Sequence, residues 1–142
     1  MKAISIRQPW ASLIISGEKT VECRSWKTSY RGHLAVCASQ KPFLLDNGIA
    51  LPGGVILGVV ELVDIMKMTR KDLGPACIRG KEAAENVLNG YAWHIRKVFE
   101  CVPVPIKGRL HLFDIDVSLV PRPEEFKDHL SYLEHLQNQS HA

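Results

Sequence analysis

Residues 55–65 form a long β-branched run, VILGVVELVDI. Val and Ile are enriched in strands, so the run predicts a central strand of a sheet. Gly58 interrupts it without a side chain and is therefore the position at which we expect the strand to bend. Bent strands allow small barrels to close.

Five further segments show strand patterns at irregular intervals: 3–7, 19–24, 33–39, 91–102 and 108–118. Regular alternation of strands and helices would be needed for a doubly wound parallel sheet, and neither a GxGxxG nor a Walker sequence is present. The pattern therefore predicts an α+β fold that is mainly β, a small mixed or antiparallel barrel of five to six strands with flanking helices.

Helices are expected between the strands. One begins at Gln8-Pro9 and ends at Gly17, with a buried stripe expected at Trp10, Leu13 and Ile14. The run KEAAENVLN at 81–89 predicts another helix, and the stretch at 40–54 predicts a loop with one helical turn.

The last residues show a helical pattern that differs from the strand-rich pattern before them. Residues 1–120 are expected to form the barrel domain, and residues 121–142 an amphipathic helix that packs on it through Phe126, Leu130 and Leu133. The total of 142 residues fits one domain of this size.

The apolar stretches are too short to cross a bilayer, and the N-terminus lacks the apolar core of a signal peptide. Four widely spaced cysteines form no CxxC pair and are expected to be buried thiols. We therefore predict a cytoplasmic protein that does not enter the membrane. His129 and His135 are expected to be solvated, and neither a metal site nor a cofactor is assigned.

Positive charge is concentrated near the N-terminus. The net charge is only +3, but residues 1–41 hold seven basic residues against the two acids Glu18 and Glu22: Lys2, Arg7, Lys19, Arg24, Lys27, Arg31 and Lys41. Such clustering favours an anionic ligand, although a solvated basic surface would produce the same pattern.

The densest group of functional residue types is QPWASLIISGEKTVECRSWKTSYRG, at residues 8–32. Its PWAS helix start, its GEKTVECRSW segment and its YRG before a strand resemble the ASCH domain family. The resemblance continues through GVVELVD, YAWHI, VPVPIKG and GRLHLFDID, and so covers about residues 1–118. It implies a PUA-like fold, similar to modules that bind RNA and to barrels that accept modified bases.

The strand at 19–24 brings candidate ligand groups together on one face. A period of two separates Thr20, Glu22 and Arg24 from the apolar positions, and Lys19 lies at the preceding turn. Lys19 and Arg24 can donate to phosphate or carbonyl oxygens, and Glu22 can accept from an exocyclic amine. The alternative is an ion pair between Glu22 and Arg24 that only satisfies itself.

Other candidate binding residues surround this strand. Trp26, Tyr30 and Trp93 offer faces on which bases could stack, and Lys27 and Arg31 could contact phosphates. Trp10 and Trp93 could equally be core residues, and Arg31 could contact only solvent. Glu61, an acid within an apolar strand, is expected either to face the cleft or to pair with a cation.

Three functions compete. The first is a binding module for RNA, single-stranded nucleic acid or a modified nucleoside, without a cofactor. The second is implied by the resemblance, because the superfamily includes amidohydrolases that deacylate N4-acetylcytidine with a lysine, a threonine and a glutamate. Their lysine matches Lys19, but Glu22 stands where they carry threonine, so Lys19 and Glu22 would be the catalytic pair. The third, also implied by the resemblance, is metal-independent ribonuclease activity, for which Lys19 and Tyr30 are candidates.

Overall fold

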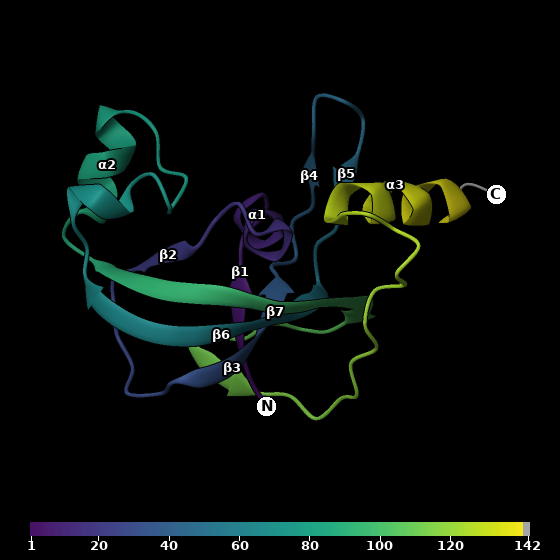
Figure 1. The fold of residues 1–142 in the computed structure, drawn as a ribbon, viewed down its shortest axis with the longest axis horizontal. Helices are drawn as coiled ribbons and strands as arrows, with labels where there is room; N and C mark the ends of the chain where they lie inside the picture. The colour runs from purple at the N-terminus through teal and green to yellow at the C-terminus, as the bar shows by residue number, and fades with distance from the viewer. Residues whose placement is uncertain (141–142) are drawn as a thin grey trace.

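The computed structural model describes residues 1–140, which form one six-stranded sheet, a small hairpin and three α-helices (Figure 1). The strand order is β2-β7-β6-β3-β1-β8. The bounds of the sheet strands are β1 Lys2–Ile6, β2 Val21–Arg24, β3 Gly32–Ala38, β6 Val55–Lys67, β7 Tyr91–Pro105 and β8 Leu112–Asp114. The sheet is mixed, because β1 pairs with β3 in parallel and the other pairs are antiparallel.

The two longest strands, β6 and β7, pair with each other inside the sheet, and the central strand predicted from the β-branched run is confirmed in β6. The register between them shifts between Ile56 and Gly58. A Cβ atom at Gly58 would lie 2.6 Å from the carbonyl oxygen of Phe99. The glycine is therefore required because the two backbones approach closely at the irregularity.

The predicted closed barrel is not observed. Strands β2 and β8 are the two edges of the sheet and do not pair with each other within residues 1–140. The amide groups of Thr20 and Val21 bond to the carbonyl of Pro75, at 2.9 and 3.3 Å, so the chain that enters β2 is held by a loop. At the opposite edge, β8 has only three residues, much shorter than the strand predicted at 108–118. Because both edge strands are short, they do not pair with each other and the sheet stays open.

The three helices lie on one side of the central strands (Figure 1). They are α1 Trp10–Ser16, α2 Lys81–Val87 and α3 His129–Ser140, and a 3₁₀ turn, η1 Arg70–Asp72, precedes α2. The predicted helices at 9–17 and 81–89 are therefore observed. The main core lies between α1 and the sheet, where Ile14 and Leu57 are packed with Trp93.

The buried face of α1 differs from the predicted stripe. Ala11, Ser12, Ile14 and Ile15 are buried, whereas Trp10 and Leu13 are only partly covered. The helix contacts both the sheet and α3, so its covered surface is wider than one stripe of helical spacing and is rotated from it.

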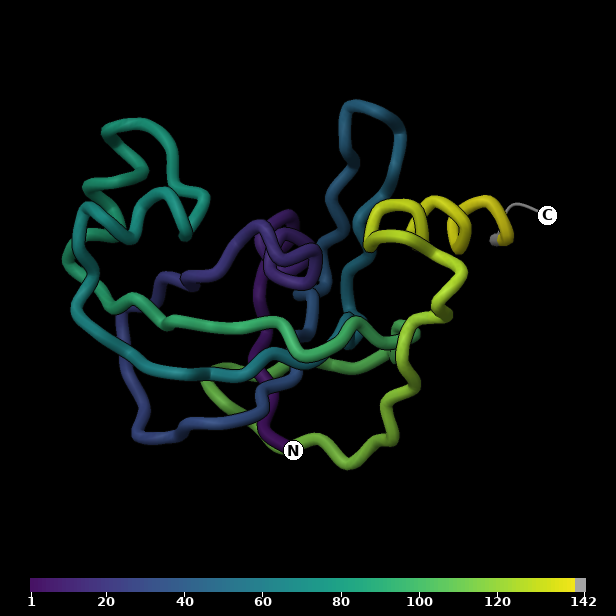
Figure 2. Tube along the Cα trace, viewed as in Figure 1, coloured from purple at the N-terminus to yellow at the C-terminus, as the bar shows by residue number. Residues whose placement is uncertain are grey.

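The stretch at 40–54 forms a hairpin, β4 Phe43–Leu44 and β5 Ala50–Leu51, in place of the predicted helical turn. Helix α3 docks beside it. Leu133 packs with Ile49 and Leu51, and the Gln137 amide oxygen accepts the N–H of Ala50 at 2.8 Å. The trace in Figure 2 shows how the segment after β8 climbs from the bottom of the molecule to α3.

The C-terminal helix begins later than predicted. Asp128 accepts the Ser131 amide at 2.8 Å and caps the helix, so Phe126 lies before its first turn, where it packs on Tyr132. Leu133 is buried as predicted, but Leu130 is 38% exposed. Residues 141–142, included in the predicted segment, lie outside the described residues.

His129 is the clearest departure from the predicted environment. Its side chain is buried, with 2% of the residue exposed, and it pairs with Glu100 of β7. The prediction of a solvated histidine was wrong, because the helix turns this side chain toward the sheet. His135 is half-buried and packs on Phe126.

The cysteines are free thiols. Cys37 and Cys101 are buried as predicted, whereas Cys23 and Cys77 are half-buried. Burial raises the pKa of Cys37 to about 12 and that of Cys101 to about 11. No helix among residues 1–140 combines the length and the apolar character that a membrane span needs.

Candidate functional site

The turn between α1 and β2 places Lys19 beside the helix. Gly17 adopts φ 90°, the left-handed conformation that ends many helices, and its N–H bonds to the carbonyl of Ile14. The amide of Lys19 then bonds back to the carbonyl of Leu13 at 3.0 Å. The turn is thus closed by backbone contacts, and the Lys19 side chain lies 5.1 Å from the ring centroid of Trp10.

Lys19, Glu22 and Arg24 form a connected charge cluster. The Lys19 Nζ atom lies 3.7 Å from Glu22 Oε1, and Arg24 Nη2 lies 2.9 Å from Glu22 Oε2. Lys19 also donates to the carbonyl of Ala76 at 2.5 Å, and Arg24 donates to the carbonyl of Ser5 at 2.9 Å. Both members of the first pair are buried, Lys19 to 3% and Glu22 to 8% exposure.

These charges lie on the wall of a cleft of about 520 Å³. One side consists of β1, Trp10 and the charge cluster. The facing side is contributed by the loop before α2 and by α2 itself, through Ile78, Ala83, Asn86 and Val87. The cleft therefore combines an aromatic ring, a carboxylate, three cations and a side-chain amide, which suits a small polar ligand with a flat apolar face.

The cleft continues along the outside of β2. A neighbouring hollow of about 200 Å³ shares Arg24, Asn86 and Val87 with it and extends to Asn89. The carbonyl of Asn89 accepts Lys67 Nζ at 3.1 Å, and the ammonium groups of Lys67 and Lys27 lie 5.3 and 5.6 Å from the Tyr91 ring. We name Lys27, Lys67 and Tyr91 the basic track.

Comparison with known proteins assigns the chain to a family. The family model described as the ASCH domain matches residues 4–105, which is more than half of the chain. The chain belongs to the ASCH domain family. This is a PUA-like family linked to RNA binding or processing.

Two curated relatives are activating signal cointegrator 1 from human and from mouse, each 36% identical over 81 residues. The match covers 44% of this chain, and the chain spans about 14% of the length of either relative. The crystal structure of ASCH from Zymomonas mobilis has a TM-score of 0.61 at 17% identity, over 81% of this chain and 87% of that one. A mutant ASCH protein from the same organism gives 0.60 at 15% identity, over 96% of both chains. These structures share the fold.

Of the candidate residues that the sequence pointed to in this ASCH domain, four line the main cleft: Trp10, Lys19, Glu22 and Arg24. Lys27 lies on the basic track. Thr20 is exposed, because β2 begins only at Val21 and the alternation that placed Thr20 beside Glu22 does not reach it.

The other aromatic candidates are used by the structure itself. Trp93 is 1% exposed and donates its indole N–H to the carbonyl of Trp26 at 3.1 Å, so it offers no free face to a base. Trp26 packs edge-on between Trp93 and His111, with centroids 4.8 Å away in both cases. The Tyr30 hydroxyl donates to the carbonyl of His33.

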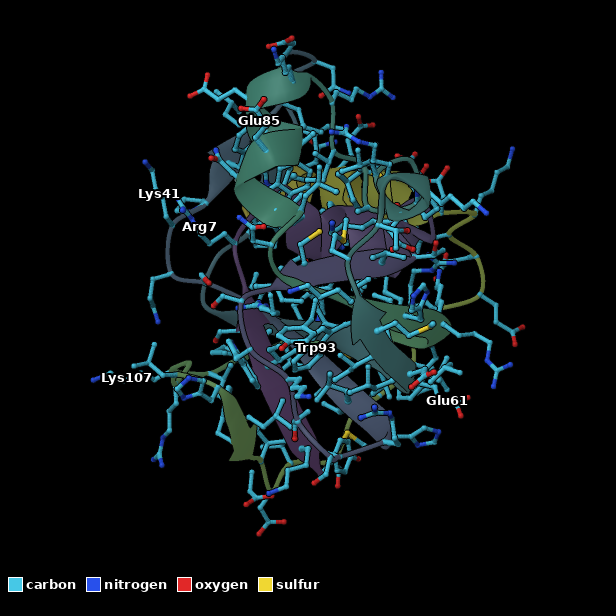
Figure 3. All side chains as sticks on the ribbon, turned by 90° about the vertical axis from the view of Figure 1, so that its left-hand side faces the viewer. Arg7, Lys41, Glu61, Glu85, Trp93 and Lys107 are labelled. Atoms are coloured by element: carbon cyan, nitrogen blue, oxygen red, sulfur yellow. The ribbon has the colours of Figure 1, made fainter. Side chains whose placement is uncertain are left out.

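Arg31 and Glu61 lie outside the cleft. Arg31 donates to the carbonyls of Thr28 and Tyr30 at 2.8 Å, and it pairs with Asp64 at 3.4 Å. Glu61 pairs with Arg96, which was the alternative to its facing the cleft. In Figure 3, Glu61 lies on the other side of the molecule from Arg7, which lines the cleft.

Sequence reasoning counted Arg7 in the basic cluster but did not select it as a site residue, and it missed Asn86. Arg7 follows β1 directly and reaches the mouth of the cleft, but a single cation after a strand carries no pattern. Asn86 lies on the face of α2 that covers the cleft, and only the position of α2 over β2 reveals its role. Lys67 was missed for the same reason, since it depends on the pairing of Lys67 with Tyr91 across β6 and β7.

Proposed function

We propose that this ASCH domain binds a nucleotide unit of single-stranded RNA, with the base in the cleft and the backbone along the basic track. The observation that carries the proposal is the buried pair of Lys19 and Glu22, 3.7 Å apart, in the wall of a cleft beside the ring of Trp10. Buried charges are costly unless they are paired or serve a ligand. Here the pair also faces a space large enough for a base.

Each group in the cleft has a chemical counterpart on a nucleotide. The Glu22 carboxylate accepts from donors such as the exocyclic amine of cytosine, and the Lys19 ammonium donates to a carbonyl oxygen of the base. Trp10 supplies a surface for apolar or stacking contact, and such stacking is worth about 1–3 kcal/mol per base. Asn86 can both donate and accept.

The basic track accounts for the phosphates. Lys27 and Lys67 are exposed, and they lie beyond the shared wall of the two hollows. An RNA strand with one base in the cleft would extend past Arg24 and Asn86 toward these ammonium groups. Binding of RNA would then release counterions and weaken as salt is added.

One observation favours a second candidate function, hydrolysis of an N4-acylated cytidine. Lys19 and Glu22 are close enough for both to act on one acyl carbonyl, Lys19 by stabilising the oxyanion and Glu22 by taking a proton from water. Glu22 stands where the amidohydrolases of this superfamily carry threonine, so the mechanism would change from attack by a hydroxyl nucleophile to carboxylate-assisted hydrolysis.

The test is a binding and product assay with cytidine 5′-monophosphate, N4-acetylcytidine and a short single-stranded RNA. For a binding protein, we expect saturable affinity, no product, and a loss of affinity in Lys19→Ala. For the hydrolase, acetate is released, and Lys19→Ala or Glu22→Gln lowers turnover by about 10²–10⁴-fold.

Arg31→Ala is the matched control, because Arg31 has a similar charge but lies outside the cleft. It should leave both affinity and turnover unchanged. Failure of all three ligands to bind, or equal losses in Lys19→Ala and Arg31→Ala, would contradict the proposed site.

A further inference from the structure

A second polar cluster lies on the other side of α1, formed by side chains from α1, β7, α3 and the segment before α3. Ser12 of α1 lies with its Oγ 2.8 Å from His129 Nε2, and His129 Nδ1 lies 2.7 Å from Glu100 Oε2. Arg122 donates to the other oxygen of Glu100, also at 2.7 Å. These contacts join residues that lie up to 117 positions apart in the sequence.

The order of these groups determines which atom donates and which accepts in each hydrogen bond. Arg122 pairs with Glu100, so Glu100 is the carboxylate of the cluster and accepts from the Nδ1–H of His129. In the neutral imidazole the proton is then on Nδ1, and Nε2 is an acceptor. The Ser12 hydroxyl therefore donates to Nε2, which is the arrangement of a serine beside its general base.

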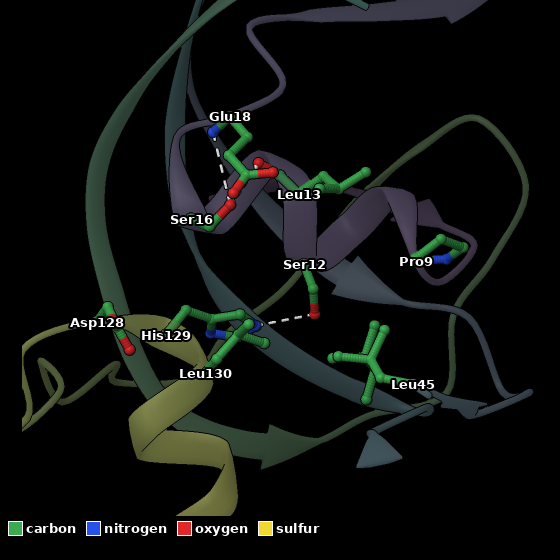
Figure 4. A pocket seen from close by; sticks show the side chains of 10 residues that line it. Pro9, Ser12, Leu13, Ser16, Glu18, Leu45, Asp128, His129 and Leu130 are labelled. Carbon is green, nitrogen blue, oxygen red and sulfur yellow. Dashed lines mark hydrogen bonds between the residues drawn. The ribbon is translucent and has the colours of Figure 1, made fainter. Parts of the chain in front are cut away.

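The cluster opens on a pocket of about 290 Å³ (Figure 4). Ser12 and His129 are part of its wall, and apolar side chains supply most of the rest: Leu13, Leu45, Leu51 and Leu130. Trp10, on the same helix, lines the nucleotide cleft. Helix α1 thus separates two sites with different linings.

We propose that Ser12 is a nucleophile for acyl transfer, with His129 as its general base and Glu100 as the group that orients the imidazole. The substrate class is a short-chain carboxylic ester, whose acyl chain would lie against the leucines of the pocket. Nucleophile, base and orienting acid within hydrogen-bond distance, in this order and beside a cavity, are the geometry that such chemistry requires.

The reaction balances within this set of groups. Ser12 Oγ bonds to the ester carbonyl carbon while its proton passes to His129 Nε2, and the alcohol leaves with that proton when the carbon–oxygen bond breaks. Water then attacks the acyl-Ser12, His129 takes and returns a proton, and the products are a carboxylic acid and free Ser12. Water is the only co-reactant.

We assign stabilisation of the negatively charged intermediate to two main-chain amides at the start of α3. The main-chain amides of His129 and Leu130 belong to the first helical turn, and no acceptor bonds to them within residues 1–140. Both residues border the pocket. Amides at a helix N-terminus favour negative charge, which is what the carbonyl oxygen acquires during attack.

The experiment treats the full chain with a fluorophosphonate probe and maps the modified residue by mass spectrometry, alongside hydrolysis of p-nitrophenyl butyrate and acetate. We expect one phosphonylated residue, Ser12. The butyrate ester should be hydrolysed about tenfold faster than the acetate ester, because two further methylene groups enter the apolar pocket. Ser12→Ala should abolish labelling, and His129→Gln should lower turnover by about 10²–10⁴-fold.

Ser118→Ala is the control, since Ser118 is exposed and does not line the pocket. It should be labelled and should turn over substrate as the parent protein does. Because His129→Gln removes a buried contact, its melting temperature is measured as well, and Ser12→Ala provides the test that does not depend on His129. An unlabelled parent protein, or ester turnover that persists in Ser12→Ala, would show that the cluster only holds α3 to the sheet and would overturn the proposal.

Discussion

Replacing Glu22 with glutamine tests whether the charge cluster of the cleft is a coupled unit. Glu22 is the only anion in the cluster and lies between Lys19 at 3.7 Å and Arg24 at 2.9 Å. The glutamine amide would keep the size of the side chain but remove its charge. Lys19, whose side chain is only 2% exposed, would then have no carboxylate to balance its charge.

The size of the effect follows from what each cation keeps. Breaking a buried ion pair by removing one partner costs about 3–5 kcal/mol. Arg24 is a quarter exposed and can be hydrated, and Lys19 keeps its bond to Ala76, so we expect a cost at or just below the lower end of that range, about 2–3 kcal/mol. For a domain of this size the melting temperature should fall by roughly 5–10 °C.

The assay is urea unfolding of Glu22→Gln, Lys19→Met and the double variant. If the charges are coupled, the double variant should be more stable than the sum of the single effects predicts, by about 1–2 kcal/mol. Glu61→Gln is the matched control: its pair with Arg96 is exposed, and its loss should cost less than about 1 kcal/mol. Additive single effects, or equal costs at Glu22 and Glu61, would show that Lys19 and Glu22 are not coupled.

Three further outcomes are expected. Thiol reagents at pH 8 should leave Cys37 and Cys101 unmodified until urea unfolds the protein, because burial raises the pKa of both thiols; rapid reaction in the native state would contradict this. Gly58→Ala should lower the melting temperature markedly while Gly74→Ala does not, since only the first Cβ meets backbone atoms. Asp128→Ala should destabilise α3 at pH 7, and the difference from the parent should vanish as pH falls below about 4, because bonds to Ser131 lower the pKa of Asp128 and their stabilisation is lost when this carboxyl is protonated. A difference that persists unchanged at pH 2 would argue against the cap.

Local sequence patterns predicted the helices and strands whose conformation depends mainly on their own residues. The β-branched run at 55–65 became the central strand β6, and Gly17 ended α1 as predicted. Closure of the barrel was a different kind of prediction. It depended on the lengths of β2 and β8 and on the loop at Pro75, whose carbonyl accepts the amides of Thr20 and Val21. A periodic pattern within one segment predicts neither the strand lengths nor this contact.

The candidate site was predicted best where its residues are close in sequence. Lys19, Glu22 and Arg24 fall within one turn and strand, so alternation could bring them together. Asn86 enters the cleft from α2, whose position over β2 is a tertiary feature. The polar segment around His129 favoured a solvated side chain, and only the contact of α3 with Glu100 on β7 reveals its burial.

The most direct test of the proposed nucleotide site is a ¹H–¹⁵N titration with a short single-stranded RNA, followed through the indole N–H signals of two tryptophans. Trp10 lines the cleft, whereas the Trp93 indole is buried and bonded to the carbonyl of Trp26. We expect the Trp10 signal to shift saturably, together with the amides of residues 19–24 and 86–89, while the Trp93 signal stays in place. A saturable shift elsewhere with an unchanged Trp10 signal would show that RNA binds outside the cleft and would contradict the proposed site.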